Sequence, residues 1–557
     1  MNRTKKIIKK LTAATAASAL ILSGTSQVFA ASYKETEKAA LDKLVAGFST
    51  YWDAVMAQYE KGQEAGFNSK MKLTVEETGK AILGAMMGMD VSWLNSVTMD
   101  MTGVVKDGKE AMNADILLND APLGTMNMCM DLANMNEYIQ IPELSQDYMA
   151  MPMIPSMEDM IADETGNMSE EDIAAYQAYV EEYRASMESY FKMLSDMTTV
   201  LPDTKTLSTL LDRYGSILIE NCGDENVTEE ALSVEGVSED CTVYEEVVTE
   251  QELLSMLKGI LTTAKEDKEL KGLLDMWSEI EGSEDLYAQF ITGVDDALSD
   301  LPEEDSEDFN PEAAMFSSKI WTNAEGKIVG REFGFVDETG TESYPLISWK
   351  NPSADGNSAL YFELWLDTSS ITLTGSGQSG DQGLTGEYVL AFDGVKTVGV
   401  GVNNLKSDTE NPGYINGSFN FSILDKGTEE EPNPLATFGL VVNITSDAAA
   451  QTTQMDFSLT SSGAPIVTLS VTGGYGASGE SVEMPDQAAL DAALSAESEE
   501  DMLAYAEGLD WSTVLTNLGA AGVPEELVAQ IQMMLENPDA GAVAGEVPET
   551  VTEDSAA

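Results

Sequence analysis

The sequence predicts an α+β fold, in which a large curved antiparallel β-meander, like a half-barrel, packs with amphipathic helices and carries a helical insertion. Apolar and polar residues alternate with a period of two from residue 317 to 473, and a shorter set of such runs occupies residues 71–141. Helical stripes with capping signals lie before, between and after these runs. A meander with one apolar face and helices at both ends is typical of a curved sheet wrapped around helices.

The first thirty residues have the pattern of a secretory signal peptide. Five basic residues precede an apolar run over residues 11–22, and Val28, Phe29 and Ala30 form a small-residue cleavage site. The apolar run is shorter than the roughly 20 residues that a membrane-spanning helix needs. We therefore expect cleavage near Ala30, a secreted or surface-associated protein, and no transmembrane segment.

The charge of the chain limits its partners. The expected signal peptide holds five of the 29 basic residues and none of the 97 acidic residues, so the remaining chain has a formal net charge of −73. Such a charge repels nucleic acid and anionic lipid head groups and favours cations and basic partners. The chain contains no histidine, which excludes Ser-His-Asp and Cys-His catalysis and His-ligated metals. We expect no cofactor, no metal site and no nucleic-acid partner.

Residues 31–142 are predicted to form an N-terminal helix followed by a β-meander. Ser32 and Glu35 form a capping-box pattern at the start of a helix over residues 33–60. Strands are predicted near residues 71–75, 97–105, 112–118, 125–132 and 138–141, with a helix over about 76–89 between the first two. Short turns rich in Gly, Asn, Asp and Pro separate the last four strands, as in an antiparallel meander.

Residues 143–310 are predicted to be a helical insertion that ends in an acidic linker. A seam with alternating three and four spacing includes Tyr176, Tyr183 and Tyr190, and further helices are expected over about 206–218, 250–261, 267–280 and 286–298. Cys222 and Cys241 flank an acidic, turn-rich segment. In an oxidising exterior they could form a disulfide, whereas in an anaerobic niche they would stay thiols.

The C-terminal part is predicted to contain a second meander over residues 311–480, helices over residues 481–540 and an acidic disordered tail over residues 541–557. The alternation is clearest at Phe419, Phe421 and Ile423, which are separated by Asn420 and Ser422. Helices are expected over residues 486–495, 499–508, 512–518 and 524–535, the last with proline in its first turn.

Three stretches carry a resemblance to known proteins: GKIVGREF at residues 326–333, GLTGEYVL at 383–390 and GYINGSFNFS at 413–422. They resemble uncharacterised secreted proteins of Gram-positive anaerobes, which are similar in layout to the lipoprotein-carrier half-barrels of the LolA and LppX type. The resemblance is one of pattern and covers about residues 60–540. It implies a carrier of a hydrophobic ligand or lipid chain.

Methionines at every second position provide the candidate binding residues. In a strand over TMNMCMD, residues 125–131, the side chains of Met126, Met128 and Met130 share one face and Cys129 lies on the other. Met99 and Met101 repeat the spacing. Core packing, an adaptable pocket wall and a Cu(I) site are all compatible with such a strand, in decreasing order of expectation.

The sequence therefore predicts a secreted, non-enzymatic protein that binds a hydrophobic small molecule, lipid or cell-envelope component in a pocket between sheet and helices. The lining residues of this hypothesis are Met99, Met101, Met126, Met128 and Met130. Two alternatives remain open. One is an extracellular glycan hydrolase that uses carboxylates, and the other is a structural cell-surface protein.

Overall fold

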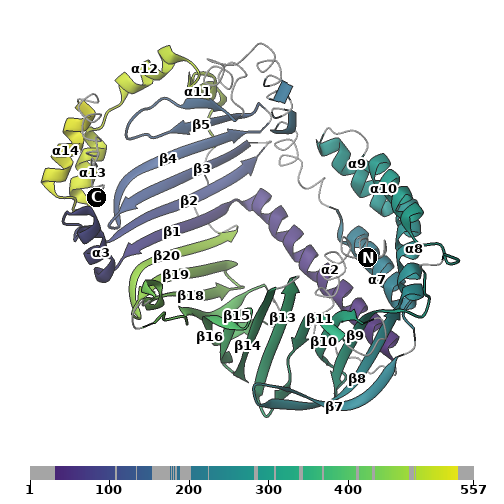
Figure 1. Cartoon of the computed structure of the whole chain (residues 1–557). Helices are drawn as coiled ribbons and strands as arrows, with labels where there is room; N and C mark the ends of the chain where they lie inside the picture. The colour runs from purple at the N-terminus through teal and green to yellow at the C-terminus, as the bar shows by residue number, and fades with distance from the viewer. Residues whose placement is uncertain are drawn as a thin grey trace, which may run out of the picture. The chain divides into compact units, whose positions relative to one another are not determined.

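The computed structural model describes residues 32–536, apart from most of 154–201 and shorter gaps of up to six residues. The chain forms two compact units. Unit 1 comprises residues 1–65, 132–135 and 154–463, and unit 2 comprises residues 66–131, 136–153 and 464–557. Both units are α+β, and each contains an open, mostly antiparallel sheet (Figure 1).

The sheet of unit 2 has eight strands among the described residues, and its spatial order is β20-β1-β2-β3-β4-β5-β6-β21. All neighbours are antiparallel except the short parallel pair β6 and β21. The strands are β1 (Phe67–Val75), β2 (Ser96–Lys106), β3 (Lys109–Leu118), β4 (Ala121–Asp131), β5 (Asn136–Gln140), β6 (Met149–Pro152), β20 (Ala464–Tyr475) and β21 (Leu494–Ser495).

The helices of unit 2 contact its sheet at the ends of strands and at the β21 edge. Helix α3 packs against β20, α13 against β4 and α12 against β21, and Figure 1 shows α3, α13 and α14 beside one end of the strands. The helices are α3 (Glu77–Met87), α11 (Gln487–Asp491), α12 (Glu499–Gly508), α13 (Ser512–Ala520) and α14 (Glu525–Glu536).

The sheet of unit 1 contains the strands β7–β19, which pair mainly in chain order. The two-residue strand β12 pairs with β13, and β11 also pairs with β13. The strands are β7 (Asn226–Val234), β8 (Val237–Thr249), β9 (Ala314–Asn323), β10 (Ile328–Val336), β11 (Ser343–Lys350), β12 (Ser353–Ala354), β13 (Asn357–Leu366), β14 (Ser369–Gly380), β15 (Gly383–Phe392), β16 (Val395–Ser407), β17 (Ile415–Ile423), β18 (Phe438–Asp447) and β19 (Thr452–Ser461).

Helices cover one end of this sheet. Helix α2 (Tyr33–Ala65) packs along α7 (Thr204–Glu220) and reaches β8, while α8 (Glu250–Glu266) follows β8 directly. Helices α9 (Lys268–Glu281) and α10 (Leu286–Asp300) pack on each other, and a 3-10 helix, η2 (Pro434–Thr437), precedes β18. Tyr33 and Ala40 of α2 contact Tyr244, Ile320 and Ile328 in one core cluster.

Local signals in the sequence explain where several helices begin. Ser32 accepts a hydrogen bond from the amide of Glu35 at the start of α2, at 3.2 Å. Thr249 and Glu252 form a complete capping box at the start of α8, which satisfies two amides that the helix itself leaves unpaired. The expected strands of the meanders and the expected helices over residues 499–508, 512–518 and 524–535 are present, whereas the helix predicted over residues 486–495 is limited to α11 and is followed by strand β21.

The region over residues 143–310 differs in part from the helical insertion that the sequence predicts. The segment between Cys222 and Cys241 is a β-hairpin, β7–β8, and the insertion over residues 143–310 is therefore not purely helical. Its strands contain five glutamates, of which only Glu229 and Glu230 are exposed, so their apolar alternation is weak in the sequence. The tyrosine seam falls largely outside the described residues, and the expected signal peptide and acidic tail lie outside them entirely.

Candidate functional site: the methionine face

The five predicted methionines lie on one face of the sheet of unit 2. In the register of β1–β4, directly paired residues share a face. Met99 pairs with Met71 and Ile116, Met101 pairs with Ala114, and Ala114 pairs with Met126. We define the methionine face as the side of β20 and β1–β6 that carries these residues. Its rows across the strands are Leu73–Val97–Leu118, Met71–Met99–Ile116, Ser69–Met101–Ala114–Met126, Phe67–Gly103–Met112–Met128–Ile139–Met149 and Val105–Glu110–Met130–Glu137–Met151.

The methionine face remains partly open. Met99, Met101, Met126, Met128 and Met130 are all half-buried, and none of them belongs to a core cluster of the described residues. Leu73, Val97 and Leu469 are 40%, 41% and 36% exposed. The methionines are thus less buried than the residues of the core clusters, although Ala114, which lies between Met101 and Met126 in their row, is fully buried. They form an apolar surface of adaptable side chains.

The opposite face of the same strands differs in both charge and cover. Lys70 pairs with Asp100 at 2.9 Å, and Lys72 pairs with Asp120 at 2.6 Å. Cys129 lies on this side, as expected, and is fully buried with Tyr138 against Leu490 of α11. The lysine–aspartate pairs and the buried thiol of Cys129 therefore lie on the face opposite the methionines.

The two ends of the methionine face differ as well. At one end, Leu118 is buried with Ala521 and Val523, which follow α13. At the other end, Glu110 of β3 and Glu137 of β5 flank Met130 of β4. The end rows are about 27 Å apart, since eight residues of β3 separate Leu118 from Glu110 at a rise of about 3.4 Å each. The face is thus a long apolar strip with one apolar end and one acidic end.

Glu110 and Glu137 are the only charged residues in these rows. Neither has a hydrogen bond or ion pair among the described residues, and burial raises the pKa of Glu110 above its usual value. Neither glutamate is among the candidate residues that the sequence predicts. The sequence signal for Glu110 is the strand period of two. Glu110 lies two and four residues from Met112 and Ala114 on β3, so the three side chains point to the same face.

Unit 1 shows how a charge is accommodated on a covered apolar face. Arg331 of β10 lies in the row of Tyr244, Ile320 and Trp349. Its Nη1 and Nη2 atoms donate to the two carboxylate oxygens of Glu37 on α2, at 2.6 and 2.9 Å. Tyr33 donates to Ser318 Oγ at 2.7 Å, and burial raises the pKa of this tyrosine. Helix α2 therefore supplies both the apolar contacts that cover this row and the carboxylate that pairs with Arg331.

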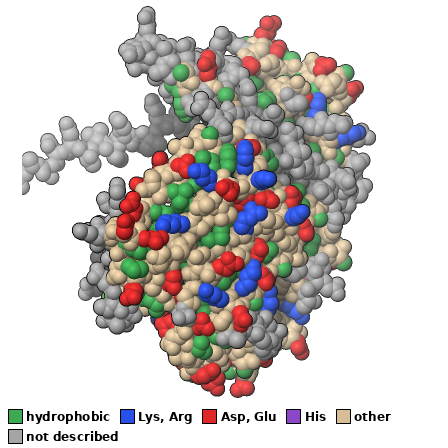
Figure 2. All heavy atoms as spheres, turned by 90° about the vertical axis from the view of Figure 1, so that its right-hand side faces the viewer, with side chains coloured by type: hydrophobic (Ala, Val, Ile, Leu, Met, Phe, Trp, Pro, Cys, Tyr) green, Lys and Arg blue, Asp and Glu red, His purple; other side chains and the backbone are tan. Residues whose placement is uncertain are grey.

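Farther along the sheet of unit 1, a second row is apolar and partly exposed. Val400, Phe421, Leu440 and Leu459 pair in this order across β16–β19. Leu440 and Leu459 are 37% and 39% exposed. In contrast, Figure 2 shows a face of the molecule on which acidic, basic and apolar side chains are interspersed.

Of the two alternatives for Cys222 and Cys241, the structure has the free thiols and not the disulfide. Cys222, Cys241 and Cys129 are all free thiols. Cys222 packs near Tyr244 and Ile320, whereas Cys241 packs with Val243 and Trp321. Since Val243 and Tyr244 point to opposite faces of β8, the two thiols are separated by the sheet. Burial raises the pKa of each to about 12, so neither is a thiolate at neutral pH.

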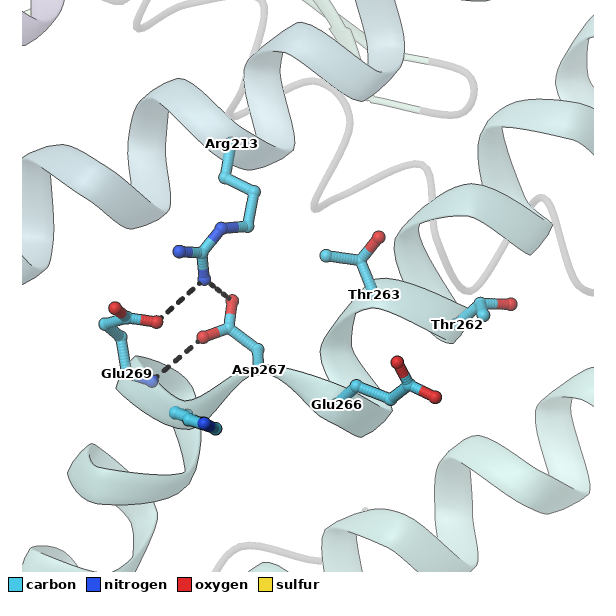
Figure 3. Close-up of a pocket in the computed structure, with 7 residues that line it drawn as sticks. Arg213, Thr262, Thr263, Glu266, Asp267 and Glu269 are labelled. Carbon is cyan, nitrogen blue, oxygen red and sulfur yellow. Dashed lines mark hydrogen bonds and ion pairs between the residues drawn. The ribbon is translucent and has the colours of Figure 1, made fainter.

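A polar pocket of about 350 Å³ lies among the helices of unit 1 (Figure 3). Arg213 of α7 points at Asp267 and Glu269, and its Nη1 atom lies 3.0 Å from the Glu269 carboxylate. Burial would raise the pKa of Asp267, but hydrogen bonds from Arg213, the Leu270 amide and Tyr214 lower it below its usual value. Because these charges already pair with one another and Asp267 caps α9, we interpret this cluster as structural.

Within the described part of the chain, no three His, Cys, Asp or Glu side chains come together in a way that could hold a metal ion. No helix in that part is both long and apolar enough to cross a membrane. Comparison with protein-family models, curated proteins and solved structures finds no match to this chain.

Proposed function

We propose that this chain is a secreted, non-enzymatic protein that binds a hydrophobic ligand, such as a lipid, on the methionine face. The observation that supports the proposal is a set of apolar rows across β1–β4 whose methionines are half-buried and belong to none of the core clusters of the described residues. Large partly exposed apolar patches in folded proteins mark binding surfaces.

The driving force would be the removal of apolar surface from water. Each buried methylene of an alkyl chain contributes about 0.8 kcal/mol. The strip is about 27 Å long, whereas one leaflet of a bilayer has a hydrocarbon layer of roughly 15 Å, half of the roughly 30 Å core. A lipid chain therefore fits within its length. Methionine side chains can repack around alkyl chains of different shapes because three rotatable bonds and a polarizable sulfur make them adaptable.

A first experiment identifies the ligand without assuming its class. The secreted protein is purified without detergent, and native mass spectrometry is followed by organic extraction and lipid analysis. We expect a bound mass that extracts into the solvent. A protein that carries no ligand and also takes up no lipid from added vesicles would contradict the proposal.

A double variant then locates the binding surface. Met101→Asp with Met128→Asp introduces two carboxylates into adjacent rows, and we expect uptake of the neutral dye Nile red to fall at least about tenfold, because an alkyl ligand would leave both charges desolvated. The matched control is Met101→Leu with Met128→Leu, which keeps the surface apolar and should retain uptake. Circular dichroism checks that both variants fold. Unchanged uptake in the folded Asp variant would exclude this face.

A further inference from the structure

The charges on the methionine face restrict which amphiphile can bind there. Its rows contain two carboxylates, Glu110 and Glu137, and no lysine or arginine. The lysines of β1, such as Lys70 and Lys72, point to the opposite face, where they pair with Asp100 and Asp120. An anionic head group would therefore meet only carboxylates on this face.

The two carboxylates also have a defined position. Both flank Met130 in the end row, and the other end of the strip is the buried Leu118 cluster with Ala521 and Val523. An alkyl chain that lies across the intervening methionine rows has its apolar terminus at Leu118 and its head group beside the glutamates. Glu110 and Glu137 make no ion pair with the described residues, so a ligand could supply their counter-charge.

We propose that the methionine face binds a cationic amphiphile, an alkyl chain with a protonated amine head group, and that Glu110 and Glu137 provide the counter-charge for the amine. This inference rests on the proposed function, because it requires that an alkyl chain binds along the strip. It adds the chemical class of the ligand and the direction in which the ligand lies along the strip. The net charge of the chain would raise the local concentration of such a cation but would not place its head group.

The test compares three probes with the same chain and different heads: dodecylamine, 1-dodecanol and dodecanoate. Each is titrated, below its micelle concentration and near neutral pH, against the full chain loaded with Nile red. We expect dodecylamine to displace the dye with an affinity about five- to tenfold above that of dodecanol, and dodecanoate to bind more weakly than dodecanol. If dodecanoate binds as tightly as dodecylamine, the inference is overturned.

A double variant distinguishes the effect of the two glutamates on amine binding from the effect of the net charge of the chain. Glu110→Gln with Glu137→Gln should reduce the preference for the amine over the alcohol to less than about twofold. Asp115→Asn is the control, because Asp115 is an exposed carboxylate on the opposite face of the same strand. It should keep the preference. An amine preference that survives in the double glutamine variant would refute the inference.

A second measurement needs no variant. Carbodiimide coupling joins the amine of bound dodecylamine to an adjacent carboxylate as an amide, and peptide mass mapping locates the product. We expect Glu110 or Glu137 to be modified in preference to Asp115. Modification spread evenly over surface carboxylates would overturn the inference, whereas failure of all three probes to displace Nile red would contradict the proposed function itself.

Discussion

Two apolar sheet faces of this protein each contain a charged residue, but only one of the two charges has a partner among the described residues. On β8–β10 of unit 1, Arg331 lies among apolar residues, and α2 covers the row and supplies Glu37 as its partner. On the methionine face of unit 2, Glu110 lies among apolar residues with no partner among the described residues, and the side chains around it remain half-buried. The first face is therefore packed like a protein core, whereas the second is only partly covered by the described residues.

The two faces differ in whether a charge on them is paired within the described residues. A buried charge without a partner is costly, so a covered face must include both members of an ion pair. A partly open face can keep a single charge because water still reaches it. Substitutions on the covered face should therefore mainly lower stability, whereas substitutions on the methionine face should mainly change ligand binding. Because a chain with two units need not unfold in one step, hydrogen exchange of individual peptides is the suitable measure of stability.

The largest effect is expected from breaking the covered ion pair. Arg331→Met leaves the carboxylate of Glu37 buried without its partner, and we expect peptides of β8–β10 to lose about 3–5 kcal/mol of protection free energy. Ligand uptake on the methionine face should be little affected. The double variant Glu37→Met with Arg331→Met removes both charges and should recover most of the loss. If the single variant loses less than about 1 kcal/mol, the pair does not stabilise the covered face.

A smaller contrast comes from truncating one apolar side chain on each face. Ile320 is fully buried against Tyr33 and Tyr244, so Ile320→Ala should cost about 2–5 kcal/mol in the peptides of β8–β10. Met101 is half-buried, and Met101→Ala should cost less than about 1 kcal/mol in the peptides of β2–β4. Equal losses at the two positions would mean that the methionine face is packed as tightly as the core.

The smallest effect concerns pH and has opposite signs in the two units. The folded-state pKa of Asp267 in unit 1 is lowered, so its stabilisation is present above the unfolded value of about 3.9 and is lost as the pH falls through the folded pKa. Asp267→Asn should therefore destabilise the start of α9 by about 1–3 kcal/mol at neutral pH, with a smaller difference in acid.

The carboxyl group of Glu110 in unit 2 should behave in the opposite way. Its folded-state pKa is raised, so the charged form opposes folding as the pH rises above about 4.3, the usual pKa of Glu. Glu110→Gln should stabilise the peptides of β2–β4 near neutral pH by less than about 1 kcal/mol, since the side chain is only half-buried. Hydrogen exchange of both variants between pH 4 and 7 checks the two signs. A Glu110→Gln variant that is less stable than the native chain at neutral pH would imply an intramolecular partner.

The period of two predicted the local geometry of the methionine strand correctly. Met126, Met128 and Met130 share one face, and Cys129 lies on the other. The sequence could not decide which of these faces is covered. The cover over Cys129 comes from Leu490 of α11, about 360 residues later in the chain, and no local pattern reports such a contact.

The same limit applies to the charges. The alternation that places Arg331 on an apolar face is visible in the sequence, but its partner Glu37 is 294 positions away. The hairpin β7–β8 was not predicted because glutamates interrupt the apolar alternation of both strands, at exposed positions such as Glu229 and at the buried Glu246. Local periodicity thus identifies strands and their faces, whereas the assembly of distant segments decides the function of each face.

The pairing of β1 with β20 has a consequence for how the protein is made. Lys70 lies opposite Thr472, so two adjacent strands of unit 2 are encoded about 400 residues apart. At a synthesis rate of about 5–20 residues per second, β1 emerges roughly 20–80 s before the strand that pairs with its free edge. During that interval the β1 edge and the apolar side chains beside it are available to other chains. The maturation of this protein should therefore depend on chaperones that protect an incomplete sheet until its last strands arrive.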